Sequence, residues 1–419
     1  MIQSIRGFRD ILPGEAELWQ KIQRIASDLF EDFGFKEIRL PIMERSELFA
    51  KSIGENTDIV EKEMYTFSDK GKEWITLRPE ATASMVRAYI QHKMYAANQI
   101  CKSYTIGPMF RRERPQKGRH RQFYQINAEV FGENSPLVDV SLIFMLKTLL
   151  SRLKVDDVEF HINSLGCPEC RPSFTRRLKE YLEPKKETLC ADCVKRSVKN
   201  PLRVLDCKVP SCGEAVADAP LLTDFLCPDC QSHFQTVTKT LEKRNVPFII
   251  DKKLVRGLDY YTRTTFEVHT GALGAQSAVA GGGRYDGLVK ALGGPNQPGI
   301  GFAIGFDRLA EIVGLKKEDC IQTPDLFIAA LGETAMTQAF DWICDFAAKG
   351  IASEMDFQNR SLKSQMKLAN RLGASHVMII GDDEIEKGEA IVRDMTASAQ
   401  VSIPLKGIVE AIEPILNLG

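Results

Sequence analysis

Apolar residues recur at helical spacing in two long stretches of the first half of the chain, residues 13–34 and 137–153. Both stretches predict amphipathic helices, because apolar residues three or four positions apart line one face of a helix. Shorter β patterns separate them. We expect a strand at residues 38–41 and a hairpin formed by residues 64–67 and 74–77.

Residues 110–131 combine a basic loop with an unusual strand. The first half holds six Lys or Arg residues against one Glu, and the second half alternates as a strand does. One face of this strand carries two aromatic residues around three polar ones: Phe123, Gln125, Asn127, Glu129 and Phe131. That face suggests the floor of a polar pocket, and the arginine forks of the loop suit phosphate oxygens. The alternative is a basic surface hairpin with a satisfied Glu.

The C-terminal quarter alternates between apolar strands and helices, beyond a linker at residues 314–324. Strands are expected at residues 326–330, 351–355 and 378–381, and helices at residues 334–349, 361–372 and 405–418. This alternation predicts a small α/β domain with a mostly parallel sheet.

The composition is that of an ordinary soluble globular protein of several domains, with 44% hydrophobic and 26% charged residues among 419. Because the net charge is −1, any contact with nucleic acid has to come from local basic patches. Residues 1–13 contain Arg6, Arg9 and Asp10 in place of an apolar signal, and no apolar run is long enough to span a bilayer. We therefore expect a cytoplasmic protein with no membrane partner.

Eight of the eleven cysteines lie in what looks like an insertion at about residues 167–235, which shows no evident apolar core of its own. They form four closely spaced pairs: Cys167 with Cys170, Cys190 with Cys193, Cys207 with Cys212, and Cys227 with Cys230. The spacing is compatible with two closed Cys₄ zinc sites, which would be structural and would stabilise the insertion. The alternative is a set of reduced thiols without metal.

Five motifs, in order along nearly the whole chain, resemble those of class II aminoacyl-tRNA synthetases. The region ending at Pro41 resembles their first motif, residues 110–129 the second and residues 301–308 the third. Two further stretches, RGLDYY at residues 256–261 and GGGRYDG at residues 281–287, resemble the pair that is specific to the histidyl-tRNA synthetase family.

This resemblance implies an α+β catalytic domain at residues 1–322, with an antiparallel sheet flanked by helices and interrupted by the Cys-rich insertion. Residues 323–419 would form an anticodon-binding α/β domain. The implied activity is an ATP-dependent histidine–tRNA ligase that uses L-histidine, ATP and histidine tRNA, with Mg²⁺ accompanying the phosphates. The first motif and the N-terminal helix imply a homodimer. The alternatives are a non-catalytic regulatory paralogue that assists ATP phosphoribosyltransferase and a metal-regulated RNA-binding protein.

The resemblance also assigns roles to single residues. Arg111 and Arg256 would stabilise the α-phosphate from opposite sides, without a general base, because the carboxylate of histidine is already ionised. Phe123 and Arg308 would sandwich the adenine, and Glu113 would lie near the adenine or the triphosphate.

The implied histidine-binding residues are Glu80, Ala81, Thr82, Arg111, Gln125, Glu129, Arg256, Tyr260, Tyr261 and Tyr285. Among them, Glu129 and Tyr261 would bind the two ring nitrogens. Without the resemblance, helix capping alone would explain Glu80 and Thr82. Arg114 and Gln116 would contact the acceptor end of the tRNA and its extra 5′ guanosine.

Overall fold

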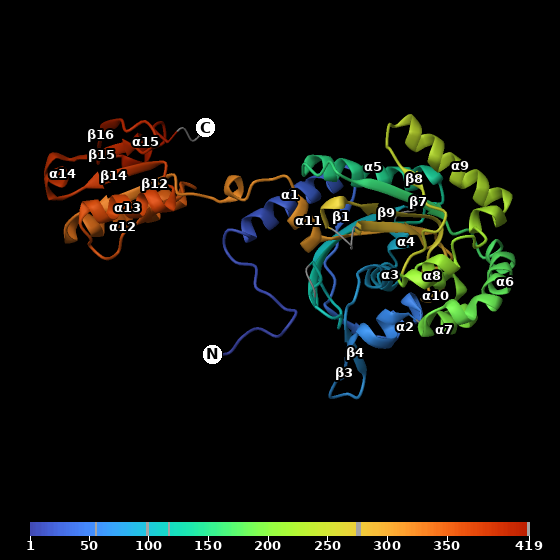
Figure 1. Cartoon of the computed structure of the whole chain (residues 1–419). Helices are drawn as coiled ribbons and strands as arrows, with labels where there is room; N and C mark the ends of the chain where they lie inside the picture. Colours follow the sequence, from blue (N-terminus) through green and yellow to red (C-terminus); the bar gives the residue numbers. More distant parts are fainter. Residues whose placement is uncertain (55–56, 98–99, 116–117, 274–277, 417–419) are drawn as a thin grey trace. The chain divides into compact units, whose positions relative to one another are not determined.

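The computed structural model describes residues 1–54, 57–97, 100–115, 118–273 and 278–416. The chain forms two compact units, Met1–Asp319 and Cys320–Gly419, and each contains its own sheet (Figure 1). The boundary between them falls inside the linker expected at residues 314–324.

An eight-stranded sheet forms the centre of the first unit. Its strands are β1 (Lys36–Glu37), β5 (Cys101–Phe110), β6 (Gln122–Phe131), β7 (Glu159–Ser164), β8 (Ile249–Ile250), β9 (Thr262–His269), β10 (Ala278–Arg284) and β11 (Gly299–Gly305). Their order is β1-β5-β6-β11-β10-β9-β7-β8, and only the edge pairings β1–β5 and β7–β8 are parallel. The antiparallel sheet of the predicted α+β domain is confirmed.

One face of this sheet is apolar and covered by helices. Phe30 of α1 (Ala16–Asp32) lies with its ring centre 5.1 Å from that of Tyr104 and 6.2 Å from that of Phe302. These two residues stand opposite Ala128 on either side of β6. Helices α1 and α5 (Pro136–Arg152) lie along this side of the sheet (Figure 1), which leaves the polar face of β6 free to form a pocket.

The other α-helices of the first unit outside the insertion are short: α2 (Ser46–Ile53), α3 (Thr82–Gln91), α4 (Met94–Ala97), α10 (Leu288–Ala291) and α11 (Phe306–Ile312). Among the helices that the structure describes, none has the length and apolar character needed to cross a membrane.

The predicted hairpin is confirmed as β3 (Tyr65–Ser68) and β4 (Trp74–Leu77), which pair in a small antiparallel sheet with β2 (Met43–Arg45). The strand expected at residues 38–41 is wrong, because these residues lie between β1 and β2. The Leu40 carbonyl accepts a hydrogen bond from the Arg78 side chain at 3.2 Å, and not from the backbone of a neighbouring strand. Pro41 has no N–H to donate to a neighbouring strand.

The Cys-rich insertion folds mainly into helices α6 (Arg171–Leu182), α7 (Ala191–Lys199), α8 (Pro210–Ala215) and α9 (Pro228–Lys243). The expectation that it lacks a core is wrong. Phe174, Leu178, Leu182 and Val204 are fully buried together with Cys193. The apolar residues of this core are spread over several short helices, so that no single stretch shows a strong period.

The C-terminal unit contains β12 (Leu326–Ala330), β13 (Ser353–Met355), β14 (His376–Ile380), β15 (Glu389–Asp394) and β16 (Gln400–Pro404). In the order β13-β12-β14-β15-β16, the three predicted strands are parallel to one another. The two strands that follow are antiparallel and were not expected from the sequence.

The helices of this unit are α12 (Glu333–Ala348), α13 (Leu362–Leu372), α14 (Asp382–Lys387) and α15 (Ile408–Ile412). The expectation of a long final helix at residues 405–418 is therefore wrong. The helix covers only Ile408–Ile412 of the residues described up to position 416. Pro414 explains the early stop, because it has no N–H to donate to the carbonyl four residues earlier.

Candidate active site

A cavity of about 370 Å³ opens above the polar face of the central sheet. The loop between β5 and β6, strands β6, β9, β10 and β11, and the start of α11 contribute its walls. The residues expected from the sequence that line it are Arg111, Glu113, Phe123, Gln125, Arg256 and Arg308. Three arginines from distant parts of the chain therefore face one cavity.

Backbone carbonyls hold two of these arginines. Arg111 donates through Nε to the Pro79 carbonyl at 3.0 Å, and its guanidinium lies 5.3 Å from the centre of the Phe123 ring. Arg308 donates through Nη1 to the Ala278 carbonyl at 2.7 Å. A carbonyl carries no net charge, but Nη1 of Arg111 also lies 3.9 Å from Oε1 of Glu113, a long ion pair at the wall of the cavity.

A carboxylate that was not expected from the sequence holds the third arginine. Arg256 pairs with Glu267 of β9, whose other oxygen lies 2.9 Å from Nε2 of His269. Burial alone would raise the pKa of Glu267, but the charge and hydrogen bond of Arg256 together with the contact with His269 outweigh burial and lower that pKa to about 2. The signal in the sequence was a single acidic residue between Phe266 and Val268 in an otherwise uncharged part of a strand.

A second carboxylate, that of Glu129, lies fully buried in the floor beside the cavity. Thr82 donates its hydroxyl to Oε1 of Glu129 at 2.6 Å, and the Tyr285 hydroxyl donates to Oε2. Gly301 lies directly opposite Glu129 on β11, where a Cβ atom would come 1.5 Å from Oε2. The glycine in this motif is therefore needed for the close approach of the carboxylate.

Burial raises the pKa of Glu129 to about 8, against the lowering effect of its two hydroxyl donors. Its immediate surroundings contain no cation among the interactions described, since its partners are hydroxyl groups. This carboxyl group therefore has unused capacity to bind a positively charged or proton-donating ligand.

Glu80 caps the start of α3, as the alternative interpretation of the sequence had it. Its two carboxylate oxygens accept the backbone N–H groups of Thr82 and Ala83, each at 2.8 Å. Ala81 and Thr82 are buried next to it. Capping and ligand binding do not exclude each other, because each carboxylate oxygen has a second lone pair.

Three tyrosines pack together beside Glu129. The ring centres of Tyr260 and Tyr261 are 4.7 Å apart, and those of Tyr260 and Tyr285 are 5.6 Å apart. Tyr285 is the tyrosine that hydrogen-bonds Glu129 in the structure. Tyr261 instead stands 5.7 Å from the guanidinium of Arg256.

Two amide side chains on the same face of β6 are incompletely satisfied. The Oε1 atom of Gln125, and both Nδ2 and Oδ1 of Asn127, are buried without a hydrogen-bond partner among the residues that the structure describes. Asn127 lies between Gln125 and Glu129 on the strand face and is only 1% exposed. Buried amide groups without partners are costly, so this strand face is suited to a polar ligand.

Of the two residues expected to contact tRNA, Arg114 does not line the cavity above the sheet. Arg114 is exposed on the basic loop, and Gln116 lies outside the described residues. On the same loop, Arg119 pairs with Glu113 at 2.9 Å.

The eight cysteines of the insertion form two groups, and the four sulfur atoms of each lie within 4.8 Å of one another. The groups are Cys167, Cys170, Cys227 and Cys230, and Cys190, Cys193, Cys207 and Cys212. Cys167 Sγ is 3.7 Å from that of Cys170, and Cys190 Sγ is 3.9 Å from that of Cys207. Tetrahedral zinc with Zn–S bonds of about 2.3 Å needs sulfur separations of roughly 3.8 Å, so both groups fit this ion.

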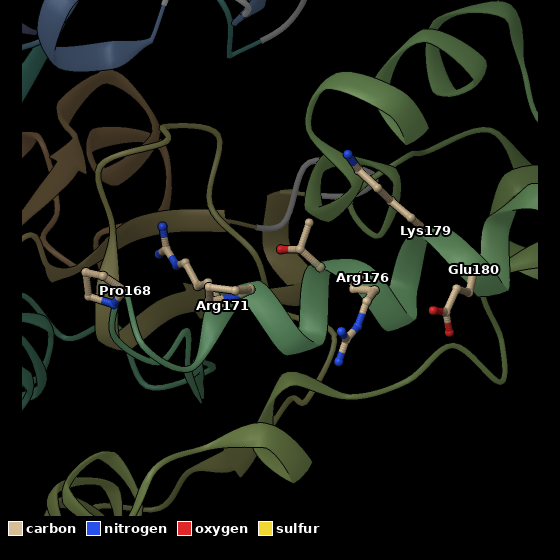
Figure 2. Close-up of a pocket in the computed structure, with 7 residues that line it drawn as sticks. Pro168, Arg171, Arg176, Lys179 and Glu180 are labelled. Carbon is tan, nitrogen blue, oxygen red and sulfur yellow. The ribbon is translucent and has the colours of Figure 1, made fainter.

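A separate hollow runs along α6 of the insertion (Figure 2). Its lining includes Pro168, Arg171, Arg176, Lys179 and Glu180. None of the residues expected to bind histidine or ATP lines it, so it is not part of the cavity above the sheet.

A family model described as histidyl-tRNA synthetase matches residues 7–309, and one described as an anticodon binding domain matches residues 325–414. The chain belongs to the histidyl-tRNA synthetase family. The resemblance drawn from the five motifs is confirmed. The first match lies within the unit Met1–Asp319 and the second within the unit Cys320–Gly419.

Relatives at high identity place the chain in the same family. The chain is 58% identical over 419 residues, covering both chains fully, to the histidine–tRNA ligase of Desulfatibacillum aliphaticivorans. It is 60% identical over 418 residues to that of Desulforapulum autotrophicum, covering 100% of this chain and 98% of the relative. Among solved structures, the apo histidyl-tRNA synthetase of S. aureus is 36% identical with a TM-score of 0.83, covering 98% of this chain and 99% of that one.

The raised pKa of Glu129 predicts a pH-dependent contribution to stability. Between about pH 4.5, the ordinary value, and pH 8, the folded state holds a proton that the unfolded chain releases. Wild type should therefore lose stability relative to Glu129→Gln as the pH rises through this window, by on the order of 2–4 kcal/mol. Calorimetric unfolding of both proteins from pH 5 to 8 measures this difference. A constant difference would contradict the assignment, and Glu31→Gln on the exposed side of α1 serves as the control.

Proposed function

We infer that the protein is an ATP-dependent histidine–tRNA ligase. It activates L-histidine with ATP to give histidyl-adenylate and pyrophosphate, and it then transfers the histidyl group to the 3′ end of histidine tRNA. The observation that carries this inference is the convergence of Arg111, Arg256 and Arg308 on one cavity beside the buried Glu129. Membership of the family supports the same reaction.

In the first step, the carboxylate oxygen of histidine attacks the α-phosphorus of ATP, and the bond from that phosphorus to the bridging oxygen breaks as pyrophosphate leaves. The nucleophile is already an anion, so no general base is needed. Both reactants and the transition state are negatively charged, and positioning together with fixed positive charge lowers the barrier. Arg111 and Arg256 supply this charge at the α-phosphate from the two sides of the cavity.

In this step Arg256 has to bind phosphate oxygens as well as Glu267. In the structure it is paired with Glu267, and an arginine has five N–H donors. Glu267 therefore fixes the orientation of the guanidinium while other donors remain for phosphate oxygens. Glu267 acts in this proposal as the residue that positions Arg256.

Histidine lies on the polar face of β6 with its ring at Glu129 and Tyr261. Glu129 accepts a hydrogen bond from one ring nitrogen, and the Tyr261 hydroxyl pairs with the other. The tyrosines at 260 and 285 shape the ring pocket, and the Tyr285 hydroxyl orients the Glu129 carboxyl group. The α-amino group binds at Gln125, whose buried Oε1 has no partner in the described structure. Ala81, Thr82 and Glu80 complete this end of the site.

ATP binds in the remaining part of the cavity. The adenine lies between Phe123 and Arg308, which both line it, and stacking on the ring adds to cation–π attraction from the guanidinium. Glu113 lies near the adenine or triphosphate edge. The carboxylates at 113 and 267 are each paired with an arginine, so Mg²⁺ would be held chiefly by the phosphate oxygens that it accompanies and would neutralise part of their charge.

Residues 1–322 constitute the catalytic domain, with the insertion at about residues 167–235, and residues 323–419 the anticodon-binding domain. The match of residues 325–414 to an anticodon-binding family supports the second assignment. Arg114 and Gln116 of the basic loop contact the acceptor end of histidine tRNA, where exposed positive charge attracts phosphates.

The two cysteine groups bind one structural zinc ion each. Sulfur separations near those of a tetrahedral site support this assignment. Four protein ligands leave no open position on either ion, so zinc takes no part in the adenylation chemistry.

The protein acts as a homodimer in the cytoplasm, where its substrates are. Exposed apolar residues occur in and next to the small sheet, and they include Ile42, Met43 and Trp74. Exposed apolar surface favours a protein interface.

Histidine-dependent exchange of labelled pyrophosphate into ATP tests the proposed function and separates it from its two rivals. Neither a regulatory paralogue nor an RNA-binding protein without enzymatic activity catalyses this exchange. We expect label in ATP only when histidine and Mg²⁺ are both present. If a folded, pure sample shows no exchange, the proposed enzymatic function is wrong.

Replacing Arg256 should lower adenylation by about three orders of magnitude, because it removes a fixed positive charge from the transition state. Histidine binding should be largely preserved. Since Arg256→Ala would leave the buried Glu267 carboxylate unpaired, the double change with Glu267→Gln is measured beside it. Single-turnover adenylation reports the rate, and Arg152→Ala on the exposed part of α5 is the control. Normal turnover in the variants would refute the role of Arg256.

Replacing Glu129 by Gln should weaken histidine binding by roughly 10- to 100-fold, which is the loss of one charge-assisted hydrogen bond. The affinity for ATP should change by less than about threefold, because Glu129 lies in the floor beside the nucleotide part of the cavity. Titration calorimetry with each substrate measures both affinities. Equal losses for the two substrates would contradict the assignment.

Metal analysis of the purified protein should find about two zinc ions per chain, one for each group of four cysteines. Cys170→Ser and Cys193→Ser should each remove one of them, and a strong chelator should lower the unfolding temperature. The exposed Cys344 lies outside both groups, so Cys344→Ser is the control. A protein that neither contains zinc nor takes it up would support metal-free thiols instead.

A further inference from the structure

The segment at residues 256–261 carries Arg256 and Tyr261 but contains neither helix nor strand. It lies between β8 and β9, so the sheet does not fix its backbone directly. The catalytic unit outside the insertion contributes a hydrogen bond from the Asp259 N–H to the Ile53 carbonyl at 3.3 Å. Two residues that must be placed accurately for catalysis thus depend on irregular backbone.

Side chains of the Cys-rich insertion hold this segment at three points. Arg203 donates through Nη1 to the carbonyl of Arg256 at 3.0 Å. Asn200 donates through Nδ2 to Oδ1 of Asp259 at 2.9 Å. Arg171 donates through Nη2 to the carbonyl of Tyr261. The bonds fall at the beginning, the middle and the end of the segment.

The three donors lie next to the two cysteine groups along the chain. Arg171 directly follows Cys170 and stands at the first turn of α6 (Figure 2). Asn200 and Arg203 lie on the stretch between Cys193 and Cys207, which belong to the same cysteine group. Closing that group around an ion would fix both ends of the stretch that carries them.

We propose that Arg171, Asn200 and Arg203 are positioning residues for the 256–261 segment, and that zinc in the two cysteine groups holds them in place. The insertion thereby connects metal binding to histidine binding. This inference rests on the proposed function, because it assigns the segment the task of binding histidine and the α-phosphate.

The arrangement predicts a selective effect on the two substrates. Tyr261 and Arg256 belong to the segment, whereas Phe123 and Arg308 come from β6 and α11. A displaced segment should therefore weaken histidine binding and slow adenylation, while ATP binding stays nearly unchanged. A general loss of folding would affect both substrates alike.

The test uses the full chain loaded with zinc and compares wild type with Arg203→Ala and Asn200→Ala. Titration calorimetry gives the affinities for histidine and ATP, and amide hydrogen exchange followed by mass spectrometry reports on residues 254–263. We expect histidine affinity to fall by about tenfold, as for one lost hydrogen bond to a charged group. ATP affinity should change by less than about twofold, and the segment should exchange faster.

Two further variants make the result specific. Arg203→Lys can still donate to the Arg256 carbonyl, so it should recover part of the histidine affinity. Arg177 is an exposed residue of α6 that pairs with Glu180, and Arg177→Ala should behave as wild type. If Arg203→Ala and Asn200→Ala are folded, bind histidine normally and show unchanged exchange in the segment, the positioning role is overturned.

Removing the zinc tests whether the metal holds the three positioning residues in place. Chelated protein should exchange faster in the segment and bind histidine less tightly, and restored zinc should reverse both changes. Zinc-free protein with wild-type exchange and histidine affinity would overturn the role of the metal. A wild-type protein that binds no histidine would instead contradict the proposed function, and the exchange comparison would still decide whether the insertion positions the segment.

Discussion

Repulsion between two anions is the constraint on which the architecture of the catalytic unit depends. A carboxylate has to approach a phosphate that is also negatively charged, so the proposed reaction requires positive charge that is already in place. Arg111 and Arg308 are held by backbone carbonyls and Arg256 by Glu267. Each guanidinium is thus oriented before the substrates arrive, which avoids the cost of ordering flexible cations during the reaction.

The floor of the site holds a buried carboxyl group, that of Glu129, whose described partners are hydroxyl groups and not cations. Glu129 fits there because β11 has Gly301 opposite it and because two hydroxyl groups donate to it. The central sheet provides the rigid frame for these contacts. The 256–261 segment lies outside that frame, and side chains of the insertion hold it in place. Rigid strands and a separately folded insertion therefore position opposite sides of one cavity.

Much of this could be predicted from the sequence, and the failures have physical causes. The alternation in residues 122–131 predicted the polar floor, and the motifs brought Arg111, Arg256 and Arg308 together. Glu267 was missed because its partner is distant in sequence and one charged residue in a strand is more often solvated. The strand expected at residues 38–41 and the long last helix failed where Arg78 and Pro414 act, which a hydrophobic pattern does not register. The core of the insertion could not be predicted from a hydrophobic period because its residues come from several short helices.

The most direct test of the central claim is a crystal structure with a stable sulfamoyl analogue of histidyl-adenylate. The sulfamoyl group stands where the α-phosphate would be. Arg111 and Arg256 should both lie within hydrogen-bond distance of its oxygens, the imidazole should contact Glu129, and the adenine should lie between Phe123 and Arg308. An analogue bound with its sulfamoyl group away from either Arg111 or Arg256, or with its imidazole away from Glu129, would contradict the assignment.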